Sequence, residues 1–474
     1  MRFFWGQIDV NKKQNNAYAD FFFSKNNLSF YFTGKIYSIQ NGELINRINM
    51  EYLYDLYVQN DINIFNIIIG DYTLCIEDNK KKILYLWQGD FTSSDTLYYR
   101  ITDDRFIFSI SLKKILGDLD IRLINEGVIN EFITQGYIIG KQTIVKEIYK
   151  WDCSNILKYD FITNSITEIR KEKIVYNSFS QSNTIKDLMY YFDNYIKKLV
   201  LNSENLGLAL SSGFDSNYLL FLFNNFSDKK IKSLTVGGEI GKNEIDSVQK
   251  IVKNYSNIQP QFALVSNSIL YDFPDMIWKL EGVVFEKGIF LSYALSQLAE
   301  KNFINTIVTG EGNDEVSNWE LKYNFLVHNI MKKSSCFFRT KDIEVIRPYL
   351  DNYFAYKITS LNFAVRNNKK YLKNLMQDKI SPIVYNLLSQ KGGSVDYTTV
   401  ISTKEQLNML KNLICNSYLF GKDFSEIVNY NSVNDIQMTL GLLYVIIFNQ
   451  LFLSKEFDFM FECNEINIRI HELL

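Results

Sequence analysis

Hydrophobic and polar positions alternate in two different styles along the chain. Up to about residue 173, short stretches rich in Tyr, Phe and Ile are separated by turn residues: LSFYFTGKIYSI, YTLCIED, KILYLWQ and RFIFSIS. Such stretches are typical of strands in an antiparallel or sandwich arrangement. Residues 124–140 instead have apolar spacing typical of a helix and end at a glycine, and NILKYDFITNSITEI returns to strand character. We therefore expect a β-sandwich in this part.

The second style begins after residue 173. Residues 183–201 repeat apolar side chains every three or four positions, as an amphipathic helix does. Strand-like LGLAL, KSLTV and QFALVS then alternate with helical NYLLFLFNNF and EIDSVQKIVKNY, and the chain from about Phe354 is mostly helical. Alternating strands and helices predict a parallel sheet covered on both faces. We place the domain boundary near Val175, giving domains 1–175 and 176–474.

Length and charge narrow the class of protein. The 474 residues exceed one hydrophobic core, which predicts at least two domains. With 51 basic and 53 acidic residues the formal charge is −2, so we expect neither nucleic acid nor a membrane as a partner. The apolar stretch 440–453 is interrupted by Asn449 and Gln450 and falls short of the roughly 20 residues of a membrane span. It is predicted to be a core helix.

Cysteine and histidine usage excludes two further classes. No cysteines have C-x-x-C spacing and the two histidines, His328 and His471, lie far apart, which argues against a zinc site and a disulfide framework. The amino terminus lacks a basic segment followed by a long apolar stretch, so we expect a reducing, cytoplasmic location. We expect the five cysteines to be core residues: Cys75, Cys153, Cys336, Cys415 and Cys463.

The stretch GLALSSGFDSNYLL passes from an apolar strand through small residues into a helix. It is either a tight turn capped by Asp or Ser, or a cradle for nucleotide phosphates at the carboxyl end of a strand. In the second interpretation, small side chains let the backbone approach phosphate closely. Asp215 would hold Mg²⁺, and Ser216 would cap the helix and donate to a phosphate oxygen. The cradle would consist of Leu210, Ser211, Ser212, Gly213, Asp215 and Ser216.

A second loop supports the cradle. INTIVTGEGNDEV, residues 304–316, is another apolar strand that runs into a Gly-rich acidic loop. Taken alone it could be an exposed turn with solvated carboxylates. Because carboxyl ends of parallel strands share one edge of a sheet, two such loops would converge on one crevice.

Together these stretches resemble the asparagine synthetase family. LSSGFDS resembles its L-S-G-G-x-D-S pyrophosphate loop, and TGEGNDE its S-G-E-G-x-D-E loop. KSLTVGGE resembles the family's strand that contacts adenine, and WKLEGVVFEKG resembles a segment that carries an acidic residue. IEVIRPYLD resembles the family's V-E-x-R-x-P-F-L-D segment, and KKYLKNLMQDKISPIVYNLLSQKGG resembles a segment that carries two lysines. The matched positions are Val236, Glu281, Arg347, Pro348, Asp351, Lys369 and Lys391.

The resemblance extends over most of the chain, since residues 70–99 resemble the family's glutaminase-like domain. It implies an Ntn-type β-sandwich followed by an α/β domain of the ATP-pyrophosphatase type. It also implies an ATP-dependent ligase that adenylates a carboxylate and couples it to an amine, releasing pyrophosphate and AMP. Asp215 and Asp314 would hold Mg²⁺, while Gly310, Val236 and Lys369 would contact ATP. Lys391 would contact the pyrophosphate.

Three glutamates are candidates to accept the proton of the amine: Glu311, Glu344 and Glu281. Glu344 and the two lysines also have plainer interpretations. Glu344 could form a salt bridge inside the second domain, and Lys369 and Lys391 could be solvated surface lysines.

Two departures from the family pattern matter. Ser212 replaces the second glycine of the first loop, which would strain the backbone if that position needs a positive φ. Glutamine-using members carry a nucleophilic cysteine at position 2, where this sequence has Arg2. We therefore expect no glutamine hydrolysis.

Two family branches also lack that cysteine: β-lactam synthetases and lasso-peptide macrolactam synthetases. The short interval between Glu311 and Glu344 resembles these cyclising branches. We expect macrolactam formation on a peptide, with a precursor peptide and a leader protease as partners. The alternatives are a small-molecule ligase, ammonia-dependent or β-lactam-forming, and a nucleotide-binding scaffold without catalysis.

Overall fold

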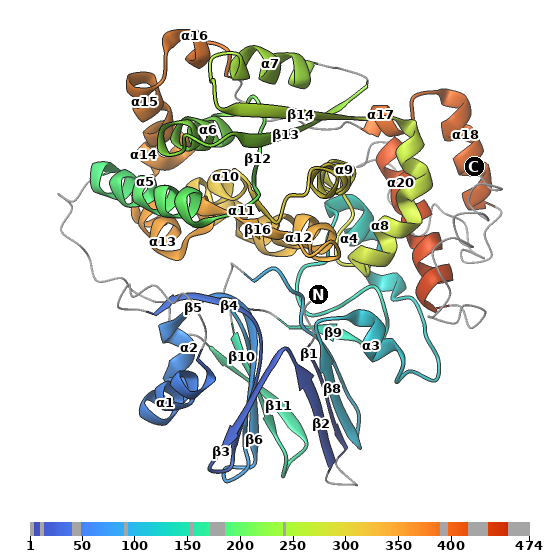
Figure 1. Ribbon diagram of the computed structural model, residues 1–474. Helices are drawn as coiled ribbons and strands as arrows, with labels where there is room; N and C mark the ends of the chain where they lie inside the picture. Colours follow the sequence, from blue (N-terminus) through green and yellow to red (C-terminus); the bar gives the residue numbers. More distant parts are fainter. Residues whose placement is uncertain are drawn as a thin grey trace.

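The computed structural model describes residues 4–9, 14–39, 49–89, 93–151, 153, 155–170, 185–239, 243–388, 397–415 and 435–453. Two antiparallel sheets lie in the lower half of Figure 1, and a parallel sheet surrounded by helices lies in the upper half. The predicted mixture of an antiparallel amino-terminal part with a parallel α/β part is confirmed.

The two antiparallel sheets pack face to face. One contains, in spatial order, β2 (Gln14–Ala19), β1 (Phe4–Asp9), β8 (Arg105–Ser109), β7 (Tyr98–Ile101) and β9 (Tyr149–Lys150). The other contains β11 (Ser165–Arg170), β10 (Asn155–Asp160), β6 (Ile83–Gln88), β5 (Ile68–Asp78), β4 (Leu28–Ile39) and β3 (Phe21–Lys25). Their inner faces meet in one cluster, where Phe106 stacks on Tyr159 with ring centroids 4.6 Å apart.

Two short helices cover the outer face of the second sheet. These are α1 (Met50–Asn60) and α2 (Ile64–Ile67), joined by a 3₁₀ turn, η1 (Asp61–Asn63). Tyr57 packs edge-on against Phe30 at 5.8 Å. The hydrophobic pattern predicted only strands and the helix at 124–140 in this part, because tyrosine-rich stretches have strand preference whenever packing is ignored.

The parallel sheet has the strand order β14 (Ile258–Val265), β13 (Ile231–Gly238), β12 (Leu206–Ala209), β15 (Thr306–Val308) and β16 (Glu344–Ile346). All four strand pairs are parallel. The chain leaves β12 toward β13 on one side and later returns to β15 on the other. The carboxyl ends of β12 and β15 therefore form the switch point at which α/β sheets bind ligands.

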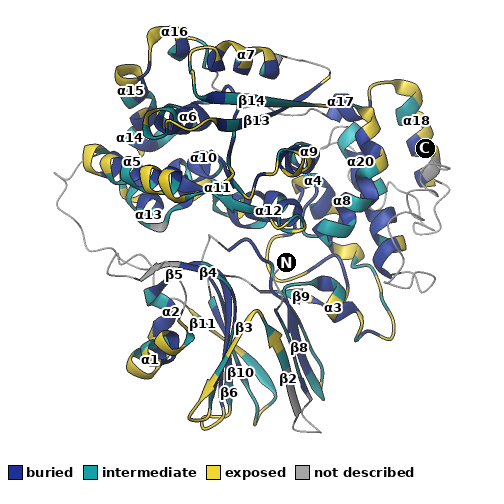
Figure 2. Ribbon diagram, viewed as in Figure 1, coloured by how far each residue is buried: buried dark blue, intermediate teal, exposed yellow. Residues whose placement is uncertain are grey.

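Helices cover both faces of the parallel sheet. One hydrophobic cluster includes α5 (Ile185–Asn202) and α6 (Phe214–Phe226), and another includes α8 (Phe273–Leu280) and α9 (Gly288–Lys301). Figure 2 shows the amphipathic result on α5, buried on one side and exposed on the other. The helix α7 (Asn243–Val252) packs on β13 and β14.

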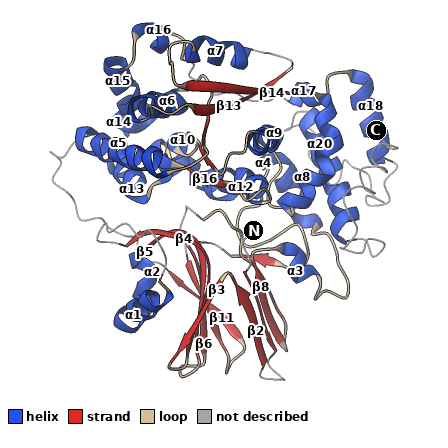
Figure 3. Ribbon diagram, in the orientation of Figure 1, coloured by secondary structure: helices blue, strands red, loops and turns tan. Residues whose placement is uncertain are grey.

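After β15 the described residues are mostly helical apart from β16, and the helical character predicted from about Phe354 onward is confirmed for the described residues there (Figure 3). In order it contains α10 (Asn313–Ser317), α11 (Trp319–Phe325), the π-helical η4 (Leu326–Ile330), α12 (Met331–Arg339), η5 (Pro348–Leu350), α13 (Asn352–Ser360), α14 (Phe363–Arg366), η6 (Asn367–Lys369), α15 (Lys370–Lys379), α16 (Pro382–Tyr385), α17 (Tyr397–Val400), α18 (Lys404–Cys415), α20 (Asp435–Phe448) and η8 (Asn449–Leu453).

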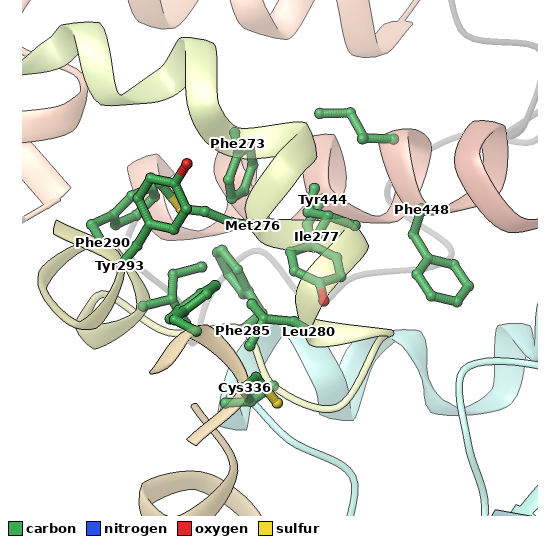
Figure 4. Close-up of a cluster of buried hydrophobic side chains, with 14 of the residues drawn as sticks. Phe273, Met276, Ile277, Leu280, Phe285, Phe290, Tyr293, Cys336, Tyr444 and Phe448 are labelled. Carbon is green, nitrogen blue, oxygen red and sulfur yellow. The ribbon is translucent and has the colours of Figure 1, made fainter. Parts of the chain in front are cut away.

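Between β8 and β9 the chain forms α3 (Leu112–Leu116), η2 (Glu126–Val128) and α4 (Ile129–Gln135), and η3 (Asn267–Asp272) precedes α8. Phe132 of α4 lies in the same hydrophobic cluster as Phe285 and Tyr444. Figure 4 shows the part of this cluster between α8 and α20. The predicted boundary near residue 175 falls outside the described residues, so the two-domain division stays a prediction.

The apolar carboxyl-terminal stretch packs inside the protein. Among the described residues, the segment Asp435–Leu453 alone is long and apolar enough to cross a membrane, and 72% of its apolar window is buried. This is the placement expected for a core helix. Cys75, Cys153 and Cys336 are buried as predicted, whereas Cys415 is exposed because it ends α18; Cys463 lies outside the described residues.

Candidate functional site

The two loops predicted from the sequence lie side by side at the switch point. The first connects β12 to α6 and the second connects β15 to α10. They touch at Gly310, where a Cβ atom would lie 3.0 Å from the Cβ of Asp215 and 3.0 Å from the backbone nitrogen of Ser216. A residue without a side chain at this position lets the loops approach this closely.

Asp215, Asp314 and Lys369 meet between the loops. The Nζ of Lys369 lies 2.7 Å from Oδ2 of Asp215 and 3.0 Å from Oδ2 of Asp314. The side-chain amide of Asn313 donates to Oδ1 of Asp215 at 2.6 Å. Both predicted magnesium ligands and one predicted ATP-binding lysine are thus brought together.

Burial and charge act in opposite directions on these groups. Burial raises the pKa of the Asp215 carboxyl; Lys369 opposes this effect and Asp314 adds to it. Burial lowers the pKa of the Lys369 ammonium, but Asp215 and Asp314 together outweigh burial and raise it. Lys369 therefore stays charged, which suits a partner for carboxylate or phosphate.

The first loop is held by hydrogen bonds from its own side chains. The backbone N–H of Ser211 donates to Oγ of Ser216 at 3.1 Å, and the amide of Asn217 donates to the carbonyl of Ser211 at 2.8 Å. The sequence suggested that Ser216 caps the helix, and this expectation is wrong. The helix begins at Phe214, so Ser216 lies in its first turn and donates to the carbonyls of Ser211 and Gly213.

Ser212 contacts a residue that the sequence patterns did not single out. Its N–H and its Oγ donate to the carboxylate of Glu244, at 2.6 and 2.9 Å. Ser212 does not have a positive φ, so serine in place of glycine does not strain this loop. Glu244 lies in the first turn of α7, where the partial positive charge of a helix amino terminus favours a carboxylate.

The remaining predicted ATP contacts lie on the adjacent strands. Leu210 continues β12, because its N–H donates to the carbonyl of Leu234 at 2.9 Å and its carbonyl accepts from Thr235 Oγ1 at 2.8 Å. Val236 is buried near the carboxyl end of β13, the strand next to β12. Both are placed at the edge of the sheet where the loops meet.

Glu311 belongs to a second polar network beside the loops. Its Oε2 accepts from Nε of Arg347 at 3.0 Å and from Oγ of Ser334 at 3.1 Å. Arg347 also donates to Oγ of Ser335 at 3.0 Å. The sequence singled out Glu311 and Arg347 but not the serines of α12, which adjoin them only in the folded chain.

A buried ion pair extends this network. Lys333 of α12 lies 2.7 Å from Oε1 of Glu286, and their side chains are 12% and 19% exposed. Burial favours the neutral form of each group. The positive charge of Lys333 nevertheless lowers the pKa of Glu286, and Glu286 and Glu311 raise that of Lys333. Neither Lys333 nor Glu286 was predicted, because no local motif marks them.

The structure does not bring Glu344 into this cluster. Glu344 begins β16 and is paired with Thr306 at the start of β15, whereas the acidic loop follows the end of β15. Its Oε1 lies 2.5 Å from Nζ of Lys35 on β4. The ion pair thus joins the parallel sheet to the sandwich, and is not the salt bridge inside the second domain that was the alternative.

Glu281 also lies elsewhere. It follows α8 in a left-handed conformation and accepts hydrogen bonds from Oγ of Ser111 at 3.1 Å and from the backbone N–H groups of Leu112 and Lys113. These are the groups at the start of α3, so Glu281 caps that helix from across the chain. Lys391 lies outside the described residues.

A small cavity separates the sandwich from the helices near Glu281. Its volume is about 30 Å³ and its lining includes Gln88, Trp151, Glu281, His328 and Lys332. This is space for about one water molecule. None of its lining residues belongs to the cluster around Lys369.

Oxygen ligands and phosphate donors are both present at the switch point. Two carboxylates converge on one point, which is the donor set that a hard divalent cation takes. The small-residue loop opens a helix of more than three turns, and such an amino terminus favours an anion. The residues therefore fit a magnesium–nucleotide pair.

One family model matches the part of the chain that contains both loops. Residues 190–333 match the family model described as asparagine synthase. This stretch is similar to that family. It contains both loops, Glu244, Glu286 and Lys333. The match supports the prediction of an asparagine-synthetase-like, ATP-dependent ligase domain in these residues.

No curated protein matches the chain in sequence. Among solved structures, the matches include the U34-tRNA thiolase NcsA of Methanococcus maripaludis, with 14% identity, a TM-score of 0.25, and coverage of 43% of this chain and 77% of that one. The glutamine phosphoribosylpyrophosphate amidotransferase of B. subtilis has 10% identity, a TM-score of 0.25, and coverage of 70% and 90%. The glutamine-dependent NAD⁺ synthetase of Acinetobacter baumannii has 11% identity, a TM-score of 0.27, and coverage of 64% and 57%.

Proposed function

We propose that the protein is an ATP-dependent amide ligase that activates a carboxylate as its acyl-adenylate and transfers the acyl group to an amine. The observation that supports this most strongly is the convergence of Asp215 and Asp314 on the single ammonium of Lys369. Two acidic loops at the switch point of a parallel sheet suit a magnesium-bound triphosphate far better than two independent turns.

The chemistry has two steps. A carboxylate oxygen attacks the α-phosphorus of ATP and pyrophosphate leaves; the amine nitrogen then attacks the acyl carbon and AMP leaves. Mg²⁺, held by Asp215 and Asp314, would neutralise charge on the phosphates. The loop from Leu210 to Ser216 would receive the pyrophosphate, Val236 would lie near the base, and Lys391 would add a positive charge to the leaving group.

Glu311 is the proposed acceptor of the amine proton, since it alone of the three candidate glutamates lies in the acidic loop. Arg347 and Ser334 hold its Oε2. A carboxylate fixed through one oxygen keeps its orientation and can accept a proton at the other.

The narrower proposal is peptide macrolactam formation of the lasso type. It rests on Arg2 at the position of the nucleophilic cysteine and on the short interval between Glu311 and Glu344, which both resemble the cyclising branches. A precursor peptide and a leader protease would then be partners.

The test is AMP formation. The full chain is incubated with MgATP, a panel of carboxylates and hydroxylamine, which traps an acyl-adenylate as a hydroxamate. We expect AMP, pyrophosphate and hydroxamate in equal amounts with the correct acid, and loss of turnover in Asp215→Asn. Asp378→Asn, on exposed α15 surface, is the matched control. ATP binding without AMP from any acid would favour the scaffold alternative, and turnover retained in Asp215→Asn would contradict the proposed site.

A further inference from the structure

We propose that Lys369 occupies the magnesium position while no nucleotide is bound, and that its ammonium moves to the phosphates when MgATP enters. Lys369 would then be a positioning residue that prevents divalent metal from binding before nucleotide. The inference rests on the proposed function, because it assumes that Asp215 and Asp314 are the metal ligands.

The first support is that the carboxylates of Asp215 and Asp314 both contact the same ammonium group. Lys369 Nζ contacts Oδ2 of Asp215 at 2.7 Å and Oδ2 of Asp314 at 3.0 Å. The other oxygen of Asp215 already accepts from Asn313, so Oδ2 is the oxygen left to face a cation. An ammonium and a metal ion would therefore compete for the same two oxygens.

The second support is electrostatic. The side chain of Asp215 is only 15% exposed, so water cannot fully compensate its charge. Two carboxylates that share one ammonium also repel each other, and this repulsion is stronger where water is largely excluded. Some cation must hold the loops together between catalytic cycles, and Lys369 is the cation in place. Asp314 is 48% exposed, which leaves a path for an incoming metal–nucleotide pair.

The third support is the backbone that delivers the lysine. Asn368 and Lys369 both have positive φ angles, 52° and 55°, at the junction between η6 and α15. Left-handed conformations are unfavourable for residues other than glycine, least so for Asn, and they concentrate at ligand clamps. The unusual backbone at this junction is therefore consistent with a residue placed at a ligand site.

The phosphate-binding side of the site is also occupied, here by a carboxylate of the chain. The N–H and Oγ of Ser212, predicted to face phosphate, donate to the carboxylate of Glu244. Both the acidic and the donor side of the predicted triphosphate site are thus engaged by side chains of the chain itself.

The experiment measures binding of Mn²⁺, a paramagnetic substitute for Mg²⁺, to the full chain by electron paramagnetic resonance. Without nucleotide we expect weak binding to the native protein, and at least tenfold tighter binding to Lys369→Met and to Lys369→Gln. A non-hydrolysable ATP analogue should remove most of that difference. Lys370→Met, at the exposed neighbouring position, is the matched control and should leave Mn²⁺ affinity unchanged.

Two results would overturn the inference: no gain of Mn²⁺ affinity in either folded Lys369 variant, or a gain that persists after Asp215→Asn is added to it. Circular dichroism establishes which variants are folded. If both variants fail to fold, native protein that binds Mn²⁺ tightly without nucleotide would contradict the inference, and weak binding that the ATP analogue strengthens tenfold would support it. These outcomes are separate from the proposed function, which fails if no acid yields AMP whatever the metal affinity.

Discussion

Gly310 lies directly against Asp215, and this contact joins the two loops of the candidate site. A Cβ at Gly310 would come within 3.0 Å of the Cβ of Asp215 and within 3.0 Å of the backbone nitrogen of Ser216. The contact fixes the separation of the two acidic loops.

Gly310→Ala should therefore move the loops apart by a few tenths of an ångström and misplace Asp215. We expect kcat/KM for AMP formation to fall by about tenfold to a hundredfold, since small displacements of catalytic groups cost this much. Steady-state kinetics of AMP release measures it. Gly117→Ala is the matched control, because the nearest atom to its added Cβ would be 3.6 Å away. Unchanged kinetics in Gly310→Ala would contradict the loop contact.

The ion pair between Lys333 and Glu286 should be worth more to stability than a surface pair. Removing one partner leaves a largely buried charge without its counter-ion, which costs about 3–5 kcal/mol. We expect Lys333→Met and Glu286→Gln each to destabilise the protein in urea unfolding, and the double variant to lose less than the sum. Lys411→Met breaks an exposed pair and should cost under about 1 kcal/mol. Additive losses in the double variant would contradict the pairing.

The same pair predicts a pH dependence. Lys333 lowers the pKa of Glu286 below its ordinary value of 4.5. A lowered carboxyl pKa contributes stability that is present above pH 4.5 and is lost as the pH falls through the folded value. Glu286→Gln should remove that part of the acid sensitivity, which urea titrations at pH 5 and below would measure.

His328 should make the protein sensitive to mild acid. Burial, together with the positive charges of Lys150 and Lys332, lowers the pKa of His328 from 6.5 to about 3. Below pH 6.5 the imidazole of His328 binds a proton in the unfolded chain but stays neutral in the folded chain. Stability is therefore fully present above pH 6.5 and falls by about 1.4 kcal/mol per pH unit below it.

His328→Phe, which keeps a ring stacked near Tyr137, should remove this effect. Between pH 7 and pH 5 we expect the native protein to lose about 2 kcal/mol more than the variant in urea unfolding. Equal losses would mean that His328 is protonated in the folded protein.

Glu281 should be structural. It accepts hydrogen bonds from the first residues of α3, so Glu281→Gln should lower stability by about 1 kcal/mol, as loss of a helix cap does. AMP formation by the folded variant should be unchanged. Ser111→Ala, which removes one donor to Glu281, should have a smaller effect in the same direction. A tenfold loss of kcat in Glu281→Gln with normal stability would instead support the role in catalysis that the resemblance implied.

Much of the fold could be predicted because its pattern is local. The strand 28–39, the strands around Leu208 and Val308, and the helix after Asp215 all follow from apolar periodicity and small-residue turns. The helix α1 was missed, because its aromatic residues have strand preference and only packing against β4 makes them helical. The start of α6 was misplaced by three residues, and that error gave Ser216 a capping role it does not have.

The candidate site, like the fold, has a part that the sequence predicts and a part that it does not. The sequence by itself determined that Asp215 and Asp314 follow two strands, and parallel strands necessarily bring such residues to one edge of a sheet. Only the tertiary structure decided their partners: Lys369 between them, Glu244 on Ser212, Lys333 on Glu286, and the removal of Glu281 and Glu344 to other contacts. The physical reason is that hydrogen bonds and ion pairs depend on distances of a few ångströms in space. Residues far apart in the chain acquire those distances only when strands take their order in the sheet and helices pack around them.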